Sequence, residues 1–202
     1  MTRLTLLLLA LLALIMPLST WAAANDPVAE VKAAIAEASP IFADTKLAPA
    51  DREQQLRAVA NEHFDFAYMA RSALGTHWKS LTPAQRKELV PVFTDYVMDT
   101  YLGTLKDSTV EAASHAVGDK AVYDGTDMAS VPSEVHLPQV ADPLQVKYML
   151  RKDTDGWRLY DIVVDNVSTM ASYRDQFNTT LNNGGYAKLI SQLRQKGSGA
   201  AG

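Results

Sequence analysis

The strongest constraint on the fold lies in residues 157–177, where an alternating segment runs directly into a helical one. Apolar and polar side chains alternate from Trp157 to Val164, as in a half-buried strand. Ser168 follows, and a serine in this place accepts hydrogen bonds from the first-turn amides of a helix. The apolar residues of that helix recur at three- and four-residue spacing at Met170, Tyr173, Phe177 and Leu181. The sequence therefore predicts a sheet face covered by an amphipathic helix.

The two faces of the predicted strand differ in charge. Tyr160, Ile162 and Val164 share one face, whereas Asp161 and Asp165 lie on the other. Because a buried carboxylate is costly, we expect the face without aspartates to point inwards.

Helices are expected before the strands. Asp26-Pro27 is a typical helix start, and Pro40 is expected to end or bend that helix. A second helix is expected after Pro49.

Two further helices carry clear start signals. Asp65 is a candidate N-cap for a short helix that stops at Gly75. Thr82 and Gln85 have the spacing of a capping box, with proline at the first helical position. A long amphipathic helix is expected from there, and Pro91 is expected to kink or split it.

The pattern changes from helical to alternating at Val110. Strands are expected over residues 110–117, 120–123, 128–137 and 144–152, and Pro132 predicts an edge or irregular position for the third. Residues 153–156 resemble a hairpin turn, and a final helix is expected over 186–196. An antiparallel sheet with helices before and after it predicts an α+β fold.

The N-terminus has the features of a secretory signal peptide. Arg3 precedes the apolar run Leu4–Met16, and Ala22–Ala24 offers a small-residue cleavage site. The alternative is an uncleaved anchor, but the run is shorter than the roughly 20 residues of a membrane span. We therefore predict a signal peptide over 1–24, one domain over 25–196 and a flexible tail over 197–202.

Composition excludes several classes of function. The chain contains no cysteine, which rules out a disulfide framework, a thiolate nucleophile and a lipidated cysteine anchor. Without Arg3 it keeps 18 basic residues against 23 acidic ones, a net charge of −5. This balance disfavours nucleic acid and anionic membrane surfaces as partners. We expect a freely diffusing monomer.

Two blocks of sequence resemble the MlaC family, which are periplasmic phospholipid-binding proteins also known as toluene-tolerance proteins. One block is WRLYDIVVDNVS at residues 157–168 followed by YRDQF at 173–177. The other is FDFAYMARSALGTHWKSLTPAQR at residues 64–86. The resemblance extends roughly from Val28 to Lys196 and is weakest between Lys106 and Pro143.

The resemblance implies an apolar hollow that takes phospholipid acyl chains, with the phospholipid as cargo and no other cofactor. It also implies two partners, an outer-membrane lipoprotein–porin complex and an inner-membrane ABC transporter with a ring of lipid-binding subunits. The implied role is to carry lipid between the membranes and so maintain outer-membrane asymmetry. Exposing about thirty methylenes of two tails to water would cost on the order of 25 kcal/mol, so the tails must be enclosed.

The residues predicted to line the hollow are apolar or aromatic and come from two helices and two strands. They are Phe93, Tyr96, Val97, Tyr101, Leu105, Val146, Tyr148, Leu150, Tyr160, Ile162, Val164, Met170, Tyr173 and Phe177. Each has the alternative role of ordinary core. Arg174 is the candidate for the headgroup phosphate, and its alternative role is a salt bridge to Asp161 or Asp165.

Three other functions stay open. A hydrolase or isomerase would need convergent polar groups, for example Asp161 with Arg158 or Tyr160, but the four histidines lack a zinc-site spacing and no nucleophile elbow or phosphate loop occurs. A related carrier would take a hopanoid or another lipid. An envelope interaction protein would have a filled core. Cavity depth separates these alternatives, and we expect no resident metal.

Overall fold

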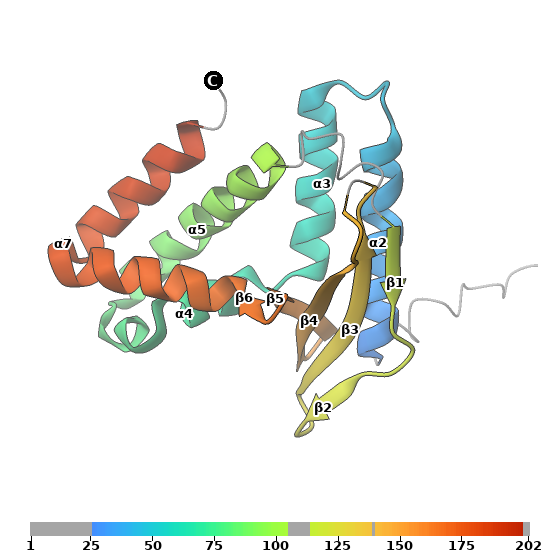
Figure 1. Cartoon of the computed structure of the whole chain (residues 1–202). Coiled ribbons are helices and arrows are strands. Elements are labelled where there is room, and N and C mark those ends of the chain that lie inside the picture. The colour runs from blue at the N-terminus through green and yellow to red at the C-terminus, as the bar shows by residue number, and fades with distance from the viewer. Residues whose placement is uncertain (1–25, 105–113, 139, 200–202) are drawn as a thin grey trace, which may run out of the picture.

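The computed structural model describes residues 26–104, 114–138 and 140–199. It shows an α+β fold in which helices pack against one antiparallel sheet, and this confirms the predicted fold class (Figure 1). The predicted signal peptide, Leu105 and the end of the predicted tail lie outside the described residues. The single-domain and tail boundaries stay predictions.

The helices precede and follow the strands as expected. They are α2 (Pro27–Ala43), α3 (Pro49–His63), α4 (Phe66–Leu74), the 3₁₀ helix η1 (Gly75–Ser80), α5 (Pro83–Thr104) and α7 (Thr169–Gly199). The strands are β1 (Ser114–Val117), β2 (Val122–Asp124), β3 (Met128–His136), β4 (Leu144–Asp153), β5 (Gly156–Val164) and β6 (Val167–Ser168).

Side-chain caps fix where the helices begin. Asp26 accepts a hydrogen bond of 3.0 Å from the Val28 amide, and Asp65 accepts one of 2.8 Å from the Tyr68 amide. The capping box of α5 is also confirmed. The Thr82 amide donates to Gln85 Oε1 at 2.9 Å, and the Gln85 amide donates to Thr82 Oγ1 at 3.2 Å.

Two prolines lie inside helices that continue past them. α2 runs through Pro40 to Ala43, and α5 runs through Pro91 to Thr104 without being divided. By contrast, Gly185 breaks α7 with φ 67° and ψ −171°, so the second half of α7 begins near Tyr186 as expected. The positive φ suits glycine because it has no Cβ.

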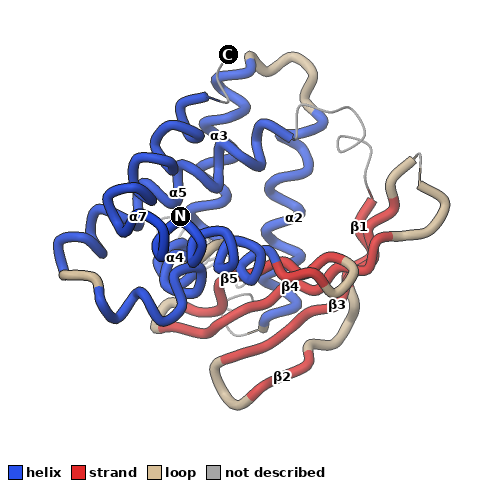
Figure 2. Tube along the Cα trace, turned by 60° about the vertical axis from the view of Figure 1, so that its left-hand side comes forward, coloured by secondary structure: helices blue, strands red, loops and turns tan. Residues whose placement is uncertain are grey.

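The sheet has the strand order β1-β3-β4-β5-β6, with β2 also pairing with β3. The predicted hairpin between β4 and β5 is confirmed by the pairing of Asp153 with Gly156. The helices gather along one side of the sheet, and β2 lies farthest from them (Figure 2).

The prediction that Pro132 places its strand at an edge is wrong. β3 pairs with β4 on one side and with both β1 and β2 on the other. Pro132 is tolerated because its carbonyl accepts from the Gly118 amide at 2.8 Å, on the side where β1 has ended and β2 has not begun. The N and C=O of one strand residue point to the same side, so the missing N–H faces this interruption and leaves the ladder with β4 intact.

The predicted inward face of β5 is only partly right, and Asp161, which was expected on the outer face, is buried. Ile162 and Val164 do pack in the sheet core, but Tyr160 does not share their face. The register shifts between Met149 and Leu150, which pair with Asp161 and Leu159, so β5 has one extra residue at a bulge. The bulge changes the alternation, and Leu159 therefore takes the inward place.

Two apolar cores hold the protein together. One lies among α4, α5 and α7, and the other lies between α2 and the sheet. In Figure 1, α2 and α3 run beside the strands, whereas α5 and α7 lie on the other side of the molecule.

Candidate functional site

A cavity of about 380 Å³ lies between the two cores. Its walls come from α2, α3, the start of α4, the C-terminal half of α5, one face of the sheet and the start of α7. This volume falls within the range of about 300–1,000 Å³ that is typical of ligand pockets.

Small side chains keep this space open. Ala34 and Ala38 of α2 and Ala60 of α3 line the cavity, and Val59 of α3 lies beside them. Larger apolar residues complete the walls. They are Val31, Ile35, Phe42, Leu56, Phe64, Phe66, Met69, Val97, Met98, Tyr101, Leu102, Tyr148, Leu159, Ile162 and Met170. No lysine or arginine occurs among the described residues that line the cavity.

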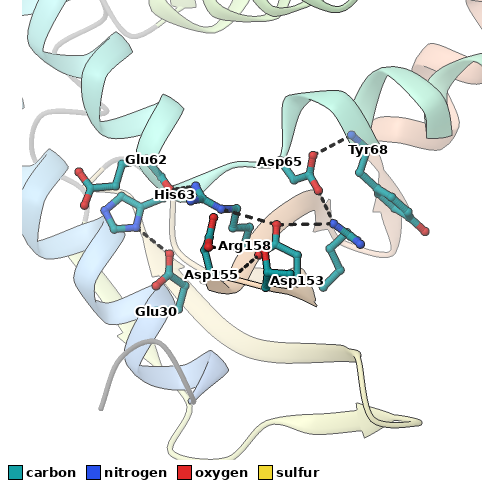
Figure 3. A network of polar contacts seen from close by, with 10 residues as sticks. Glu30, Glu62, His63, Asp65, Tyr68, Asp153, Asp155 and Arg158 are labelled. Carbon is teal, nitrogen blue, oxygen red and sulfur yellow. Dashed lines mark hydrogen bonds and ion pairs between the residues drawn. The ribbon is translucent and has the colours of Figure 1, made fainter. Parts of the chain in front are cut away.

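His63 is one of the few polar residues on the wall, and two glutamates of α2, Glu30 and Glu37, hold its ring. Figure 3 shows the contact with Glu30. Its Nδ1 lies 2.8 Å from Glu30 Oε1, and its Nε2 lies 3.2 Å from Glu37 Oε2. The hydrogen bond to Glu30 raises the pKa of His63 even though burial opposes the charge. His63 therefore fastens the end of α3 to α2 and has no ring nitrogen left for a ligand.

Asp161 is buried and is used to begin α7. Its carboxylate accepts hydrogen bonds from the Ser168 hydroxyl and, at 3.0 Å, from the Met170 amide. Ser168 in turn accepts from the Ala171 amide at 2.9 Å, as the sequence predicts. Negative charge at a helix N-terminus is favourable, which explains an aspartate on the inner side of the bulge.

Two hydroxyls on the wall are also bound within the protein. Thr169 donates to the Ile162 carbonyl at 2.9 Å, and Ser39 donates to the Ile35 carbonyl at 2.6 Å. Among the described wall residues, the Tyr148 hydroxyl makes a longer contact, at 3.4 Å from His115 Nδ1. The wall therefore presents an almost entirely apolar surface to whatever enters.

Comparison with known proteins gives the family. The family model described as "MlaC protein" matches residues 31–195. The chain belongs to the MlaC family.

A solved structure shares the fold of this MlaC-family chain. It is the phospholipid-binding protein from Ralstonia solanacearum, determined in complex with a phospholipid, with a TM-score of 0.73 and 23% sequence identity. The match covers 88% of this chain and 99% of the other.

Five of the predicted lining residues of this MlaC-family member lie on the cavity wall. They are Val97, Tyr101, Tyr148, Ile162 and Met170. Phe93, Tyr96, Tyr173 and Phe177 instead form an aromatic cluster in the helical core, which we call the aromatic core. Whether any of these residues contacts a ligand stays a prediction.

The other predicted lining residues lie elsewhere. Val146, Leu150 and Val164 belong to the core between α2 and the sheet. Tyr160 meets the ring of Tyr68 edge-on at 5.0 Å, on the opposite face of β5. Leu105 lies outside the described residues.

Arg174, the predicted headgroup ligand, joins two helices and is not among the cavity-lining residues. Its Nε donates to the Ser72 carbonyl at 3.0 Å, and its guanidinium also contacts the Ser72 hydroxyl at 3.2 Å. The alternative salt bridge to Asp161 or Asp165 is not found among the described residues, where Asp161 accepts from Ser168 and Asp165 from the Gln145 amide. Its role at a headgroup stays a prediction.

A polar network fixes the α3–α4 junction to the sheet below the cavity (Figure 3). Arg151 Nη1 lies 2.6 Å from Asp65 Oδ2, and Arg158 donates to the Glu62 carbonyl. The Asp65 amide also donates to the Leu159 carbonyl at 2.8 Å. These contacts hold the wall residues Phe64 and Leu159 in place.

The walls that α2 and α3 supply were not among the predicted lining residues. The signal was present, because Val31, Ala34, Ile35, Ala38 and Phe42 recur at helical spacing. Within the described residues, no helix has the length and apolarity of a membrane span, and no group of three or more metal-binding side chains is found.

Proposed function

We propose that this protein binds phospholipid with the acyl tails enclosed in the cavity. The observation that carries the proposal is the wall itself, where apolar side chains dominate and nearly every polar group is already hydrogen-bonded within the protein. Membership of the MlaC family and the phospholipid complex of a protein with the same fold support it.

The same observation favours a carrier over an enzyme. A catalytic site needs polar groups that converge on a substrate and are free to exchange protons with it. Asp161 caps α7, and His63 has both ring nitrogens against carboxylates. Each is therefore committed to structure.

At the finer level, we infer a passive periplasmic shuttle between the outer and inner membranes that maintains outer-membrane lipid asymmetry. An apolar cavity offers a tail an environment close to that of the bilayer, so lipid exchanges near equilibrium and its direction is set by donor and acceptor. The proposed donor and acceptor are the outer-membrane lipoprotein–porin complex and the ring subunit of an inner-membrane ABC transporter. Export by a cleaved signal peptide is part of this proposal.

Native mass spectrometry of the purified mature protein, followed by lipid extraction, tests the binding step. We expect one stoichiometric glycerophospholipid complex. An apo mass that persists after incubation with phospholipid vesicles would contradict the proposal, and a bound polycyclic lipid would redirect it to the hopanoid alternative.

A charge on the cavity wall provides the mutational test. Ile162→Asp places an unpaired carboxylate beside the tails and is expected to abolish lipid copurification. Val122→Asp is the matched control, because Val122 is 66% exposed on β2, outside the cavity wall. A folded Ile162→Asp protein, checked by circular dichroism, that keeps its full lipid load would refute the assignment of this wall. Should that variant not fold, Ala38→Phe reduces the cavity without adding charge and is expected to lower loading.

A further inference from the structure

The Tyr148 hydroxyl differs from the other polar groups on the cavity wall. Tyr148 is 8% exposed, so its hydroxyl has little access to water. Within the described residues its one hydrogen-bond contact is His115 Nδ1 at 3.4 Å, beyond the usual range for a good hydrogen bond. Thr169, Ser39 and Asp161 make contacts of 2.6–3.0 Å. A buried hydroxyl with one long contact has hydrogen-bonding capacity left for a ligand.

The charge states of the pair leave it neutral. Partial burial of the ring lowers the pKa of His115, although the residue as a whole is exposed, and burial raises the pKa of Tyr148 to about 12. If His115 Nδ1 carries the proton, it donates to the phenol oxygen and the phenol O–H is free to point into the cavity. If the phenol donates to Nδ1 instead, the proton on His115 is at Nε2. In either arrangement the pair offers one neutral donor beyond its internal hydrogen bond.

A neutral donor in an apolar wall suits a neutral acceptor. A phosphate is charged and is bound in proteins by arginine, lysine or several convergent donors, and no lysine or arginine lines the cavity among the described residues. An ester carbonyl is uncharged and accepts one or two hydrogen bonds. The chemistry of the pair therefore matches an acyl ester better than a headgroup phosphate.

The position of the pair agrees with this chemistry. His115 lies on the short strand β1 and is exposed, whereas Tyr148 lies on β4 and is buried, and both line the cavity. The pair therefore spans the boundary between solvent and the apolar wall. In a phospholipid, the ester groups occupy the same boundary between headgroup and tails.

We propose that Tyr148, positioned by His115, donates a hydrogen bond to an acyl ester carbonyl of the bound lipid and so sets how deep the lipid enters the cavity. This inference rests on the proposed function, because it requires a lipid in the cavity. It adds a selection for ester-linked tails that an apolar wall alone does not provide.

The test is competition between ester- and ether-linked lipid. Delipidated protein is incubated with vesicles that contain equal amounts of diacyl and dialkyl phosphatidylethanolamine with the same chain lengths, and native mass spectrometry gives the ratio bound. The native protein is expected to prefer the diacyl lipid by about 3- to 10-fold, the effect of one hydrogen bond. Tyr148→Phe keeps the ring and is expected to bring the ratio close to 1. Tyr123→Phe, on β2 and outside the cavity wall, is expected to keep the native ratio.

Infrared spectroscopy of the bound diacyl lipid provides a second readout. A hydrogen bond lowers the stretching frequency of an ester carbonyl, so we expect a shifted band in the native protein that is lost in Tyr148→Phe. Equal ratios and equal carbonyl bands in the native and Tyr148→Phe proteins would overturn the inference. Failure of the native protein to bind either lipid would instead refute the proposed function.

Discussion

The aromatic core and the cavity are built from similar apolar patterns but are filled differently. The ring centroids of Phe93 on α5 and Tyr173 on α7 lie 6.1 Å apart, and those of Tyr173 and Phe177, both on α7, lie 5.6 Å apart. Between α2, α3 and the sheet, the corresponding positions include Ala34 and Ala38, and a space of about 380 Å³ is left. Large rings fill one region, and small side chains leave the other hollow.

This difference in filling gives the two regions different roles in stability and in binding. A filled core gains dispersion and hydrophobic free energy from every contact, whereas the walls of a cavity forgo part of both. α3 shows this loss of burial, since Leu56 and His63 are its only buried residues among those described. We therefore expect the helical half to supply stability and the hollow half to supply binding.

Truncation is expected to give the largest contrast between the two regions. Phe93→Ala removes a fully buried ring from the aromatic core and is expected to lower the free energy of unfolding by about 3–5 kcal/mol. Ile162→Ala, at the half-buried cavity wall, is expected to cost about 1 kcal/mol because it opens no new closed void. Urea denaturation measures both values, and equal losses would show that the two regions contribute alike.

Enlarging a side chain is expected to lower stability in the filled core but to lower lipid binding at the cavity wall. Ala73→Leu adds bulk in the filled helical core, where Ala73 is fully buried, and is expected to cost about 1–3 kcal/mol. Ala34→Leu adds the same side chain at the cavity wall and is expected to change stability by no more than about 0.5 kcal/mol. It is also expected to reduce bound lipid in native mass spectra. A large loss of stability with an unchanged amount of bound lipid in Ala34→Leu would contradict the claim that Ala34 faces an open lipid cavity.

The smallest expected effect is a pH-dependent change in stability at the contact between α2 and α3 on the cavity wall. The pKa of His63 is raised in the folded protein, chiefly by Glu30, so the stabilisation is complete below the unfolded pKa of about 6.5 and is lost as pH rises through the folded pKa. The stability difference between native protein and His63→Gln is expected to be on the order of 1 kcal/mol at pH 6 and to shrink as pH rises towards 8.

Urea denaturation at several pH values between 5.5 and 8.5 measures this difference. Glu30→Gln removes the partner carboxylate and is expected to show the same trend relative to the native protein. A difference that grows with pH would mean that His63 is buried in its neutral form.

Local signals in the sequence predicted much of the fold. The capping box of Thr82 and Gln85, the caps at Asp26 and Asp65 and the β4–β5 hairpin depend on neighbours within a few residues, and all are confirmed. The fold class followed from the order of these elements.

Other features depend on contacts that are distant in sequence. The bulge at Tyr160 is set by pairing with β4 and makes Leu159, instead of Tyr160, point inwards. β3 is central because both β1 and β2 pair with its outer side, and Pro132 fits there because it lies opposite the gap between them. Periodicity alone also does not separate Phe93, which faces a filled core, from Val97, which lies one turn away on the cavity wall.

Pro132 has a further consequence for behaviour at high concentration. The outer edge of β3 is covered by two short strands, β1 with four residues and β2 with three, and they are separated where Gly118 approaches Pro132. A Cβ at Gly118 would lie 2.9 Å from the Pro132 carbonyl oxygen, so this close approach requires glycine. Long unpaired strand edges recruit other chains and begin aggregation. The divided edge offers an incoming strand no stretch longer than four residues among those described, and this would help the proposed lipid carrier to resist aggregation.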